Sequence, residues 1–498
     1  MLTDALKKIV LNATMIKGLT SDALRDLARY EETTTEFGSA RYVTKIRSRS
    51  AKFTEIAIDG TLTDDQKRVV EEVITFLKGK ELICVERTMC DNPDMKIHCK
   101  TYYTKDYARI GYMWHNSLFD LSEKHVAEQT VLQVPEWKER KIIVDAKNKV
   151  TFILGSDYFG ECKKAHLRMA MYVMKQRGGL GLHAGSKLVR VKGDDGKIIE
   201  KGVILFGLSG TGKTTLTVHD FGLEDPEGVV IRQDDVVLMD DNGFCYGTED
   251  GFFIKTEGLD EDQTVLYHAA TMPHAILENV HVGENGKVDF CDYEFTTNGR
   301  GIIRRRDIEQ ADDSVDLRKA NIIIFITRRE DIIPPVTKLT PAQGAAAFML
   351  GESIETSAGD PSKAGQSKRV VGTNPFIIGP PHEEGNQFYK ILKENPDMEC
   401  YLLNTGTVGN TDKITIKDSA AIIREIARGR IRWKKCPDWN YLIAEDVPCV
   451  DPKKLDPALY FPKKEYASRV DKLRKERKEW LAQFSGLDEE IAGALFRD

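Results

Sequence analysis

The 498-residue sequence lacks the cysteine patterns of a disulfide framework or of a structural zinc site. Its nine cysteines are an odd number, scattered along the chain with no Cys-x-x-Cys pair. Because unpaired thiols persist in a reducing compartment, the cysteine usage favours a cytoplasmic protein.

The sequence also lacks an uninterrupted apolar run near the ~18 residues that a membrane-spanning helix needs. Its first residues, MLTDALKKIVLNATMIKG, contain no apolar core of a signal peptide. Basic residues are not in excess either, since the formal net charge is −6. We therefore expect neither a membrane nor nucleic acid as a partner.

What is present is an ordinary globular composition, with 41% hydrophobic and 30% charged residues. The length suffices for two domains, and Gly178–Gly179 marks a plausible boundary between them. We predict an N-terminal domain over residues 1–180 and a C-terminal domain over residues 181–498.

Short elements of both kinds indicate an α/β protein with mixed sheets. Apolar residues recur at helical spacing over 63–80, and 463–484 is typical of a charged amphipathic helix. Strand-like runs occupy 141–156, 202–207, 228–241, 320–329 and 399–406. The D-N-G and E-N-G turns at 241–243 and 284–286 favour hairpins over a uniform βαβ repeat.

The most informative stretch is KGVILFGLSGTGKTTLTVHDFG, residues 201–222, which predicts a strand, a glycine-rich loop and a helix. Its centre satisfies G-x-x-x-x-G-K-[ST] in full. In such a loop, backbone N–H groups and the helix N-terminus surround phosphate oxygens, the lysine reaches the terminal phosphates and the threonine binds Mg²⁺. The predicted nucleotide-binding residues here are Gly207, Leu208, Ser209, Gly210, Thr211, Gly212, Lys213, Thr214 and Thr215.

A phosphate loop needs an acid nearby for its metal, and Asp234 and Asp235 stand inside the apolar run GVVIRQDDVVLMDD. Two adjacent carboxylates within a strand are costly to bury unless they meet cations. We therefore expect a metal role for both, on a strand. At this point ABC and AAA-type ATPases, small-molecule kinases and GTPases all remain possible.

The material before the loop narrows the choice. The stretch SDYFGECKKAHLRMAMYVMKQRGGLGLHAGSK, residues 156–187, resembles the ATP-dependent phosphoenolpyruvate carboxykinases. That family has a Tyr-x-Gly-Glu-x-Lys-Lys motif and a histidine nineteen residues later, found here at 158–164 and at His183. Further similar segments, which extend the resemblance from about residue 38 to about 420, are RSRSAK (47–52), WHNSLF (114–119), EDGFFIK (249–255), LENV (277–280), PPVTKLTPAQ (334–343) and NTG…ITIKDS (404–419).

The resemblance implies the family's two-domain fold, with a substrate-binding N-terminal domain and a nucleotide- and metal-binding C-terminal domain that carries the phosphate loop. It also implies the reaction: oxaloacetate and ATP give phosphoenolpyruvate, ADP and CO₂. The cofactors implied are Mg²⁺ on the nucleotide and a second ion, typically Mn²⁺. Lys164, His183 and Asp235 match the Mn²⁺ ligands, and a buried lysine beside a second cation can serve as a neutral amine.

Substrate contacts also follow from the resemblance. Arg49 and Tyr158 match residues that bind the substrate, and a guanidinium suits the bidentate capture of a carboxylate. Arg300 matches an arginine between substrate and γ-phosphate, where it neutralises charge during transfer. Lys255 matches a further γ-phosphate contact, and Lys413 and Ser419 fall at nucleotide contacts.

Several positions depart from the family pattern, mostly around the nucleoside. Lys413 replaces an arginine, Ser419 a threonine and Thr407 a tryptophan, while segment 357–388 matches poorly. Lysine reproduces neither the fork nor the stacking of arginine, so the carboxykinase chemistry is better supported than the choice of ATP over GTP or another donor.

Three hypotheses follow. The first is a metal-dependent phosphoenolpyruvate carboxykinase, which converts oxaloacetate. The second is a related P-loop kinase with another acceptor, which has no need of Lys164, His183 and Asp235 together with Arg49. The third is a motor, transport or regulatory ATPase, although the sequence has neither a second ATPase signature nor a basic groove.

Overall fold

The computed structural model describes residues 2–47, 51–121, 126–208, 210–261, 263–354 and 366–496. It divides into two compact units. Unit 1 comprises Met1–Val173 and Gly247–Glu309, and unit 2 comprises Met174–Tyr246 and Gln310–Asp498. The chain therefore leaves unit 1 and later returns to it, whereas the sequence predicted two continuous segments. The mixed α/β class is confirmed, and the assignment of substrate and nucleotide binding to separate domains stays a prediction.

Unit 1 is built on a seven-stranded mixed sheet. Its strands, in spatial order, are β1 (Thr14–Lys17), β5 (Glu81–Met89), β6 (Ile97–Thr104), β7 (Gln129–Val134), β9 (Val150–Leu154), β8 (Lys141–Asp145) and β4 (Thr54–Ala57). The pairs β5–β6 and β8–β9 are antiparallel, and the pairs β1–β5, β6–β7, β7–β9 and β8–β4 are parallel. The strand-like run predicted over 141–156 forms two strands, the antiparallel pair β8–β9.

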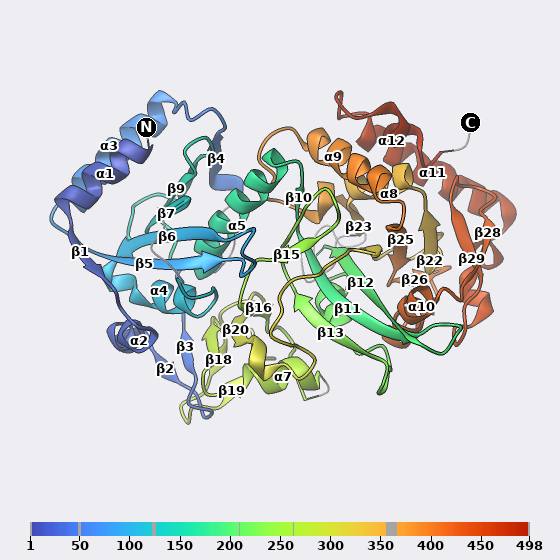
Figure 1. The fold of residues 1–498 in the computed structure, drawn as a ribbon, viewed down its shortest axis with the longest axis horizontal. Coiled ribbons are helices and arrows are strands. Elements are labelled where there is room, and N and C mark those ends of the chain that lie inside the picture. The colour runs from blue at the N-terminus through green and yellow to red at the C-terminus, as the bar shows by residue number, and fades with distance from the viewer. Residues whose placement is uncertain are drawn as a thin grey trace. The chain divides into compact units, whose positions relative to one another are not determined.

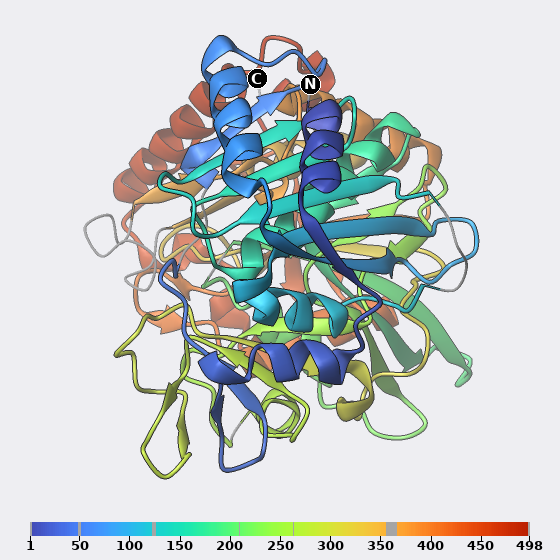
Figure 2. The same ribbon diagram turned by 90° about the vertical axis from the view of Figure 1, so that its left-hand side faces the viewer.

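Two helices, α1 (Leu2–Asn12) and α3 (Asp64–Leu77), lie side by side on one face of this sheet (Figure 2). The helix predicted over 63–80 is α3, which begins at a capping box between Thr63 and Gln66. Its apolar residues at helical spacing face the sheet and join a buried cluster with α1. The remaining helices that lie in unit 1 or begin there are α2 (Ser21–Leu27), α4 (Ala108–His115), α5 (Phe159–Gln176) and α7 (Thr264–Ala270).

A second sheet of unit 1 joins strands far apart in the sequence. Its order is β16 (Gly251–Lys255), β20 (Arg300–Arg304), β17 (Ile276–Glu278), β3 (Ala40–Tyr42) and β2 (Thr33–Thr34). The parallel pairing of β17 with β3 attaches residues 247–309 to the N-terminal segment. The E-N-G turn joins the hairpin β18 (His281–Val282) and β19 (Val288–Asp289), with Gly286 at φ +81°.

Unit 2 is built on an eight-stranded mixed sheet. Its strands, in spatial order, are β13 (Gly228–Gln233), β11 (Ala184–Lys192), β12 (Ile198–Gly207), β21 (Ile322–Thr327), β25 (Glu399–Asn404), β22 (Val336–Leu339), β29 (Leu442–Asp446) and β28 (Arg432–Lys435). The three central strands β12, β21 and β25 run parallel. Their carboxyl ends therefore meet at one edge of the sheet.

Side chains of these central strands alternate between two buried clusters, as the twofold period of a strand requires. Ile204 and Phe206 of β12 join the cluster that holds helices α8 (Pro341–Leu350), α9 (Pro381–Glu394) and α11 (Lys463–Leu481). Val203 and Leu205 join the cluster that holds α6 (Lys213–Val218) and α10 (Ile416–Arg428). Figure 1 shows α8 and α9 on the opposite side of the sheet from α10. Apolar runs without a polar alternation, such as GVILF, are explained by burial on both faces.

Smaller elements complete unit 2. A three-stranded sheet contains β10 (Leu180–Leu182), β14 (Val237–Met239) and β15 (Cys245–Gly247), and the last residue of β15 is counted in unit 1. Two strand pairs are β23 (Glu352–Ile354) with β24 (Ser367–Arg369) and β26 (Thr407–Val408) with β27 (Asp412–Lys413). The remaining helix is α12 (Glu489–Gly493). The helix predicted over 463–484 is α11. No helix within the described ranges is both long and apolar enough to span a membrane.

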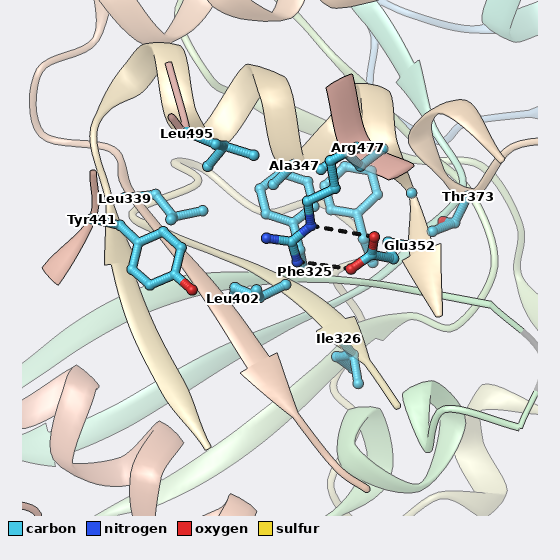
Figure 3. A pocket seen from close by; sticks show the side chains of 13 residues that line it. Phe325, Ile326, Leu339, Ala347, Glu352, Thr373, Leu402, Tyr441, Arg477 and Leu495 are labelled. Carbon is cyan, nitrogen blue, oxygen red and sulfur yellow. Dashed lines mark hydrogen bonds and ion pairs between the residues drawn. The ribbon is translucent and has the colours of Figure 1, made fainter. Parts of the chain in front are cut away.

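A buried ion pair holds α11 to this framework. Arg477 donates through Nη2 to Oε1 of Glu352 at 2.7 Å and through Nε to Oε2 at 3.3 Å. Figure 3 shows the two side chains facing each other at the wall of a cavity of about 20 Å³, which is room for about one water molecule. Burial by itself raises the pKa of Glu352. Three neighbouring arginines lower it by more, so the pKa lies well below the usual range.

Candidate active site

The Tyr-x-Gly-Glu-x-Lys-Lys motif forms the start of helix α5 in unit 1. Tyr158 is buried directly before the first helical residue, Phe159. A Cβ atom at Gly160 would lie 2.4 Å from the Tyr158 ring, so only glycine allows the ring to fold back over the helix start. The motif therefore fixes the position of the Tyr158 side chain, which the sequence predicts to bind substrate.

Asp157 organises the backbone around Tyr158. Its two carboxylate oxygens accept hydrogen bonds from the backbone N–H groups of Lys45 and Ile46, both at 2.9 Å. The guanidinium of Arg109 donates to the Asp157 carboxylate at 2.9 Å and to its backbone carbonyl at 2.8 Å. These contacts hold the chain that leads into RSRSAK. The predicted substrate ligand Arg49 lies outside the described residues.

Asn298 connects three parts of the candidate substrate site. Its side-chain amide nitrogen donates to the backbone carbonyl of Arg47 at 2.9 Å and contacts the Tyr158 hydroxyl at 3.4 Å. Its side-chain oxygen accepts a hydrogen bond from Nη2 of Arg300 at 2.7 Å. One amide thus sets the relative positions of Tyr158, Arg300 and the segment that precedes Arg49.

Lys163 and Lys164 are both buried on α5. Nζ of Lys163 lies 3.1 Å from Oε2 of the buried Glu249 and 5.1 Å from the centre of the Phe253 ring. The Glu249 carboxylate thus compensates the positive charge of the buried Lys163 side chain. Lys164 is 8% exposed, which agrees with a lysine in a desolvated site rather than on a surface.

Lys255 and Arg300 are cross-strand partners in the antiparallel pair β16–β20. Arg300 also lies over the Phe253 ring, 5.5 Å from its centre, and Lys255 forms an ion pair with Glu257. Directly opposed side chains on two strands lie close together. The two cations that the sequence assigns to the γ-phosphate are therefore brought together by the sheet.

Glu278 of β17 holds the N-terminus of α5. Its Oε1 accepts a hydrogen bond from the backbone N–H of Phe159 at 3.0 Å, which satisfies a helix-end donor. The side chain is completely buried, and this burial raises its pKa to about 7 against the opposing effect of Arg109. The same strand position pairs with Arg300 in β20, so Glu278 links α5 to the strand that carries Arg300.

The phosphate-loop sequence lies in unit 2 between β12 and α6. Gly210 and Gly212 have φ values of +83° and +91°, which glycine adopts without strain. A Cβ atom at Gly207 would lie 2.5 Å from Oγ1 of Thr211, so the first glycine is required for close packing. Helix α6 begins at Lys213, and Lys213, Thr214 and Thr215 are partly exposed. Ser209 lies outside the described residues.

His183 and Asp235 come together within unit 2. Nε2 of His183 lies 3.2 Å from Oδ1 of Asp235, and both side chains are about nine-tenths buried. The other ring nitrogen, Nδ1, lies 2.7 Å from the backbone carbonyl oxygen of Thr373. A proton on Nδ1 leaves Nε2 as a lone-pair donor, so the carbonyl selects the tautomer that a metal ligand needs. An imidazole nitrogen beside a carboxylate oxygen fits Mn²⁺ or Mg²⁺ chemistry.

Asp234 and Asp235 do not lie on a strand, and this prediction was wrong. Strand β13 ends at Gln233, the two aspartates form a bend, and β14 begins at Val237. Both residues are buried, each 8% exposed. The apolar residues on either side suggested a continuous strand, but the bend lets two consecutive buried carboxylates avoid the opposite-face alternation of a strand.

The described residues contain no cluster of three or more His, Cys, Asp or Glu side chains that could hold a metal ion. The third predicted Mn²⁺ ligand is a lysine, Lys164, so only two members of the predicted set, His183 and Asp235, belong to these four residue types. Lys164 belongs to unit 1, and its place beside the other two ligands stays a prediction.

The predicted nucleotide contacts Lys413 and Ser419 also lie in unit 2. Lys413 is exposed on β27. Ser419 is buried on the first turns of α10, three residues into the helix, and its backbone N–H bonds to Thr415. Sequence reasoning did not assign Asp157, Asn298 or Glu278, although Asp157 and Glu278 lie inside stretches that carried the resemblance and Asn298 stands two residues before Arg300.

Comparison with known proteins identifies the family of this chain. A family model described as phosphoenolpyruvate carboxykinase matches residues 17–453. The chain is 34% identical over 484 residues to a phosphoenolpyruvate carboxykinase (ATP) of Aeropyrum pernix, covering 96% of both proteins. The chain belongs to the ATP-dependent phosphoenolpyruvate carboxykinase family.

Two further members of the carboxykinase family are more distant. The chain is 28% identical over 435 residues to a phosphoenolpyruvate carboxykinase (ATP) of Brucella anthropi, covering 81% of this chain and 76% of that protein. It is 28% identical over 429 residues to the protein of the same name from Brucella suis, with the same coverage. The predicted family, the ATP-dependent carboxykinase activity and the use of ATP with divalent metal ions are confirmed.

Proposed function

We propose that the chain converts oxaloacetate and ATP into phosphoenolpyruvate, ADP and CO₂ with the residues described above. The observation that carries the proposal lies in unit 2. There the glycine-rich loop before Lys213 and the pair His183–Asp235 stand on strands and bends of one compact unit. A nucleotide cradle and a metal-ligand pair in one unit are what a metal-dependent phosphoryl transfer requires.

The reaction has two balanced steps. The bond between the departing carboxylate carbon and its neighbour breaks, CO₂ leaves, and the electron pair forms the enolate. The enolate oxygen then attacks the γ-phosphorus of ATP, and ADP departs. Bound Mg²⁺ and Mn²⁺ would supply charge neutralisation at the phosphates and at the enolate oxygen.

Side chains of unit 1 bind and orient the acceptor. Tyr158, fixed by Gly160 and by Asn298, provides a hydroxyl for the substrate. Arg300, held by Asn298, provides a guanidinium for a carboxylate or for the migrating phosphoryl group. Lys255, opposite Arg300 in the sheet, adds a second cation for the γ-phosphate. Arg49 keeps its predicted role as a carboxylate ligand.

Residues of unit 2 bind the donor. Backbone N–H groups of the loop and Nζ of Lys213 would neutralise the phosphate oxygens of ATP, with Thr214 and Asp234 toward Mg²⁺. His183 and Asp235 would bind Mn²⁺, with Lys164 as the third ligand that the resemblance implies. Lys413 and Ser419 are proposed contacts on the nucleoside side.

We place the enzyme in the cytoplasm, acting on small molecules. All nine cysteines lie within the described ranges, and none of them forms a disulfide, which supports a reducing compartment. The division of labour between a substrate-binding and a nucleotide-binding domain is part of the same proposal, with unit 1 and unit 2 as the two bodies.

The test is turnover of the purified protein with oxaloacetate, Mn²⁺ and Mg²⁺, followed as phosphoenolpyruvate, with ATP, GTP and pyrophosphate compared in parallel. We expect product with ATP, and its loss in Lys213→Ala and in His183→Ala. Product formed with GTP or pyrophosphate but not with ATP would support the carboxykinase reaction and refute ATP as its phosphoryl donor. Tight nucleotide binding without phosphoenolpyruvate from any donor would refute the enolate of oxaloacetate as the phosphoryl acceptor.

A further inference from the structure

Arg328 follows β21 directly and reaches the phosphate loop. Its Nη1 donates to the backbone carbonyl oxygen of Gly210 at 3.1 Å. Its backbone is also fixed, since its N–H contacts Oγ of Ser353 at 3.3 Å and its carbonyl accepts from the N–H of Ile354 at 3.2 Å. The guanidinium therefore stands beside the loop on a backbone that is held from a neighbouring strand.

The topology explains why a residue at this position can serve the loop. Strands β12, β21 and β25 are parallel neighbours, so their carboxyl ends share one edge of the sheet. In open α/β sheets ligands bind outside this edge. The chain after β25 reaches the loop in the same way, because Oγ1 of Thr405 donates to the carbonyl of Thr211 at 2.7 Å. Arg328 and Thr405 hold consecutive loop carbonyls.

Within the described part of the chain, the charge of Arg328 is not matched by a carboxylate. Among the residues that the structure describes, no Asp or Glu oxygen lies within ion-pair distance of its guanidinium, and the side chain is partly exposed. Its neighbour Arg329, by contrast, is buried and lies near Asp331. A guanidinium has five N–H donors, and the contact with Gly210 uses one of them. The remaining donors suit the oxygens of a phosphate.

The nucleotide side of this chain also lacks the arginine that the resemblance implies, because Lys413 stands in its place. Lys413 pairs with Thr407 in the hairpin β26–β27. The N–H of Thr407 in turn donates to the carbonyl of Arg329 at 3.0 Å. Arg328 is therefore connected through two backbone steps to the strand of Lys413, within the same unit.

We propose that Arg328 is a nucleotide-binding residue whose guanidinium contacts the phosphate chain of ATP. The proposal rests on the proposed nucleotide-binding role of the loop. Arg328 adds a forked cation to the single point charge of Lys213, and its bond to Gly210 holds the fork at the loop. The proposal assigns a role to the end of the strand-like run 320–329, which contains no residue of the proposed active site.

The experiment compares Arg328→Gln and Arg328→Lys with the wild-type protein. Dissociation constants of MgATP, MgADP and tripolyphosphate are measured by calorimetry without oxaloacetate. In Arg328→Gln we expect all three constants to rise about tenfold or more, because a charge-assisted hydrogen bond is lost. Arg328→Lys keeps the charge but loses the fork, and its constants should fall between those of the other two proteins.

A matched control is Arg474→Gln. Arg474 also donates to a backbone carbonyl, that of Asp438 at 2.8 Å, but it lies on α11 and has no contact with the loop. Its dissociation constants should stay within about twofold of wild type. The KM for oxaloacetate at saturating ATP should likewise stay within about twofold in the Arg328 variants.

Three results would overturn the proposal. The first is a change of less than twofold in Arg328→Gln. The second is weaker nucleotide binding with unchanged tripolyphosphate binding, which would place the contact on the nucleoside. The third is full recovery in Arg328→Lys, which would reduce the role to one hydrogen bond on Gly210. Since the calorimetric binding measurements use no oxaloacetate, these three results are independent of whether wild-type protein forms phosphoenolpyruvate.

Discussion

Nε2 of His183 lies 3.2 Å from Oδ1 of Asp235, while the carbonyl of Thr373 lies 2.7 Å from Nδ1 on the other side of the ring. The carbonyl fixes the imidazole through Nδ1, and Nε2, which keeps its lone pair, lies beside the Asp235 carboxylate as the second ligand atom for a cation. Thr373 has a φ of +51°, which is unusual for a β-branched residue. The backbone at this position is held in a strained conformation that delivers the carbonyl to His183.

Replacing the imidazole should weaken Mn²⁺ binding. Removing the hydrogen-bond partner of a metal-ligating histidine typically lowers metal affinity 10- to 100-fold. Removing the ligand itself, in His183→Ala, should therefore raise the Mn²⁺ dissociation constant at least about 100-fold. Electron paramagnetic resonance of free Mn²⁺ measures this without turnover. His382→Asn, at a partly exposed histidine of the same unit, is the control. Equal Mn²⁺ binding in His183→Ala and wild type would remove His183 from the metal site.

Removing the Asn298 amide should impair the use of oxaloacetate more than that of ATP. Asn298→Ala loses the contacts with Arg47, Tyr158 and Arg300, each worth about 1 kcal/mol. We expect kcat/KM for oxaloacetate to fall about 10- to 100-fold, with the dissociation constant of MgATP nearly unchanged. Asn285→Ala, in an exposed hairpin turn, should behave as wild type. A larger effect on ATP than on oxaloacetate would contradict this role.

Glu278 should make stability depend on pH near neutrality. Its pKa is raised to about 7 in the folded protein, chiefly by burial. Between its ordinary pKa and about pH 7 the folded state keeps a proton that the unfolded state has released, so this group makes stability fall as pH rises through that window.

Glu278→Gln removes this titration but retains an oxygen that can accept the Phe159 N–H. We therefore expect the variant to gain stability relative to wild type as pH rises from 5 to 8, reaching about 2 to 3 kcal/mol at pH 8. Urea denaturation across this range measures the difference. A constant offset at all pH values would show that Glu278 does not titrate there.

Breaking the buried pair Arg477–Glu352 should destabilise the protein strongly. Arg477→Met leaves Glu352 buried with Arg369, whose Nη2 still donates to it at 2.7 Å. The loss of one partner of a buried pair costs about 3 kcal/mol or more, seen as a lower denaturation midpoint. Arg474→Met, on the same helix but partly exposed, should cost less than about 1 kcal/mol. Similar losses in both variants would deny the buried pair a special role.

Local patterns predicted the elements whose contacts are themselves local. The capping box at Thr63 and Gln66, the apolar spacing of α3 and the glycine spacing of the loop are all visible within a few residues. The candidate residues Tyr158, Lys255 and Arg300 were named from the resemblance, and the structure places all three in unit 1.

Long-range contacts were not predictable in this way. Asn298 acts through Arg47, which is 251 residues away, and Glu278 acts through Phe159, which is 119 residues away. No periodicity connects such positions. The bend at Asp234 and Asp235 was missed because apolar neighbours on both sides are equally typical of one strand and of two strands that flank a bend. The return of the chain to unit 1 depends on the pairing of β17 with β3, which leaves no local signal.

That return has a consequence for synthesis on the ribosome. When residue 246 has emerged, β2 and β3 still lack the strands β17, β20 and β16 that complete their sheet. The phosphate loop is translated before the N-terminal unit can close. Because domains fold as units and expose apolar surface until they do, the nascent chain carries an open sheet edge until residue 309. A ribosome that stalls between residues 246 and 309 would prolong the exposure of this sheet edge and with it the risk of aggregation.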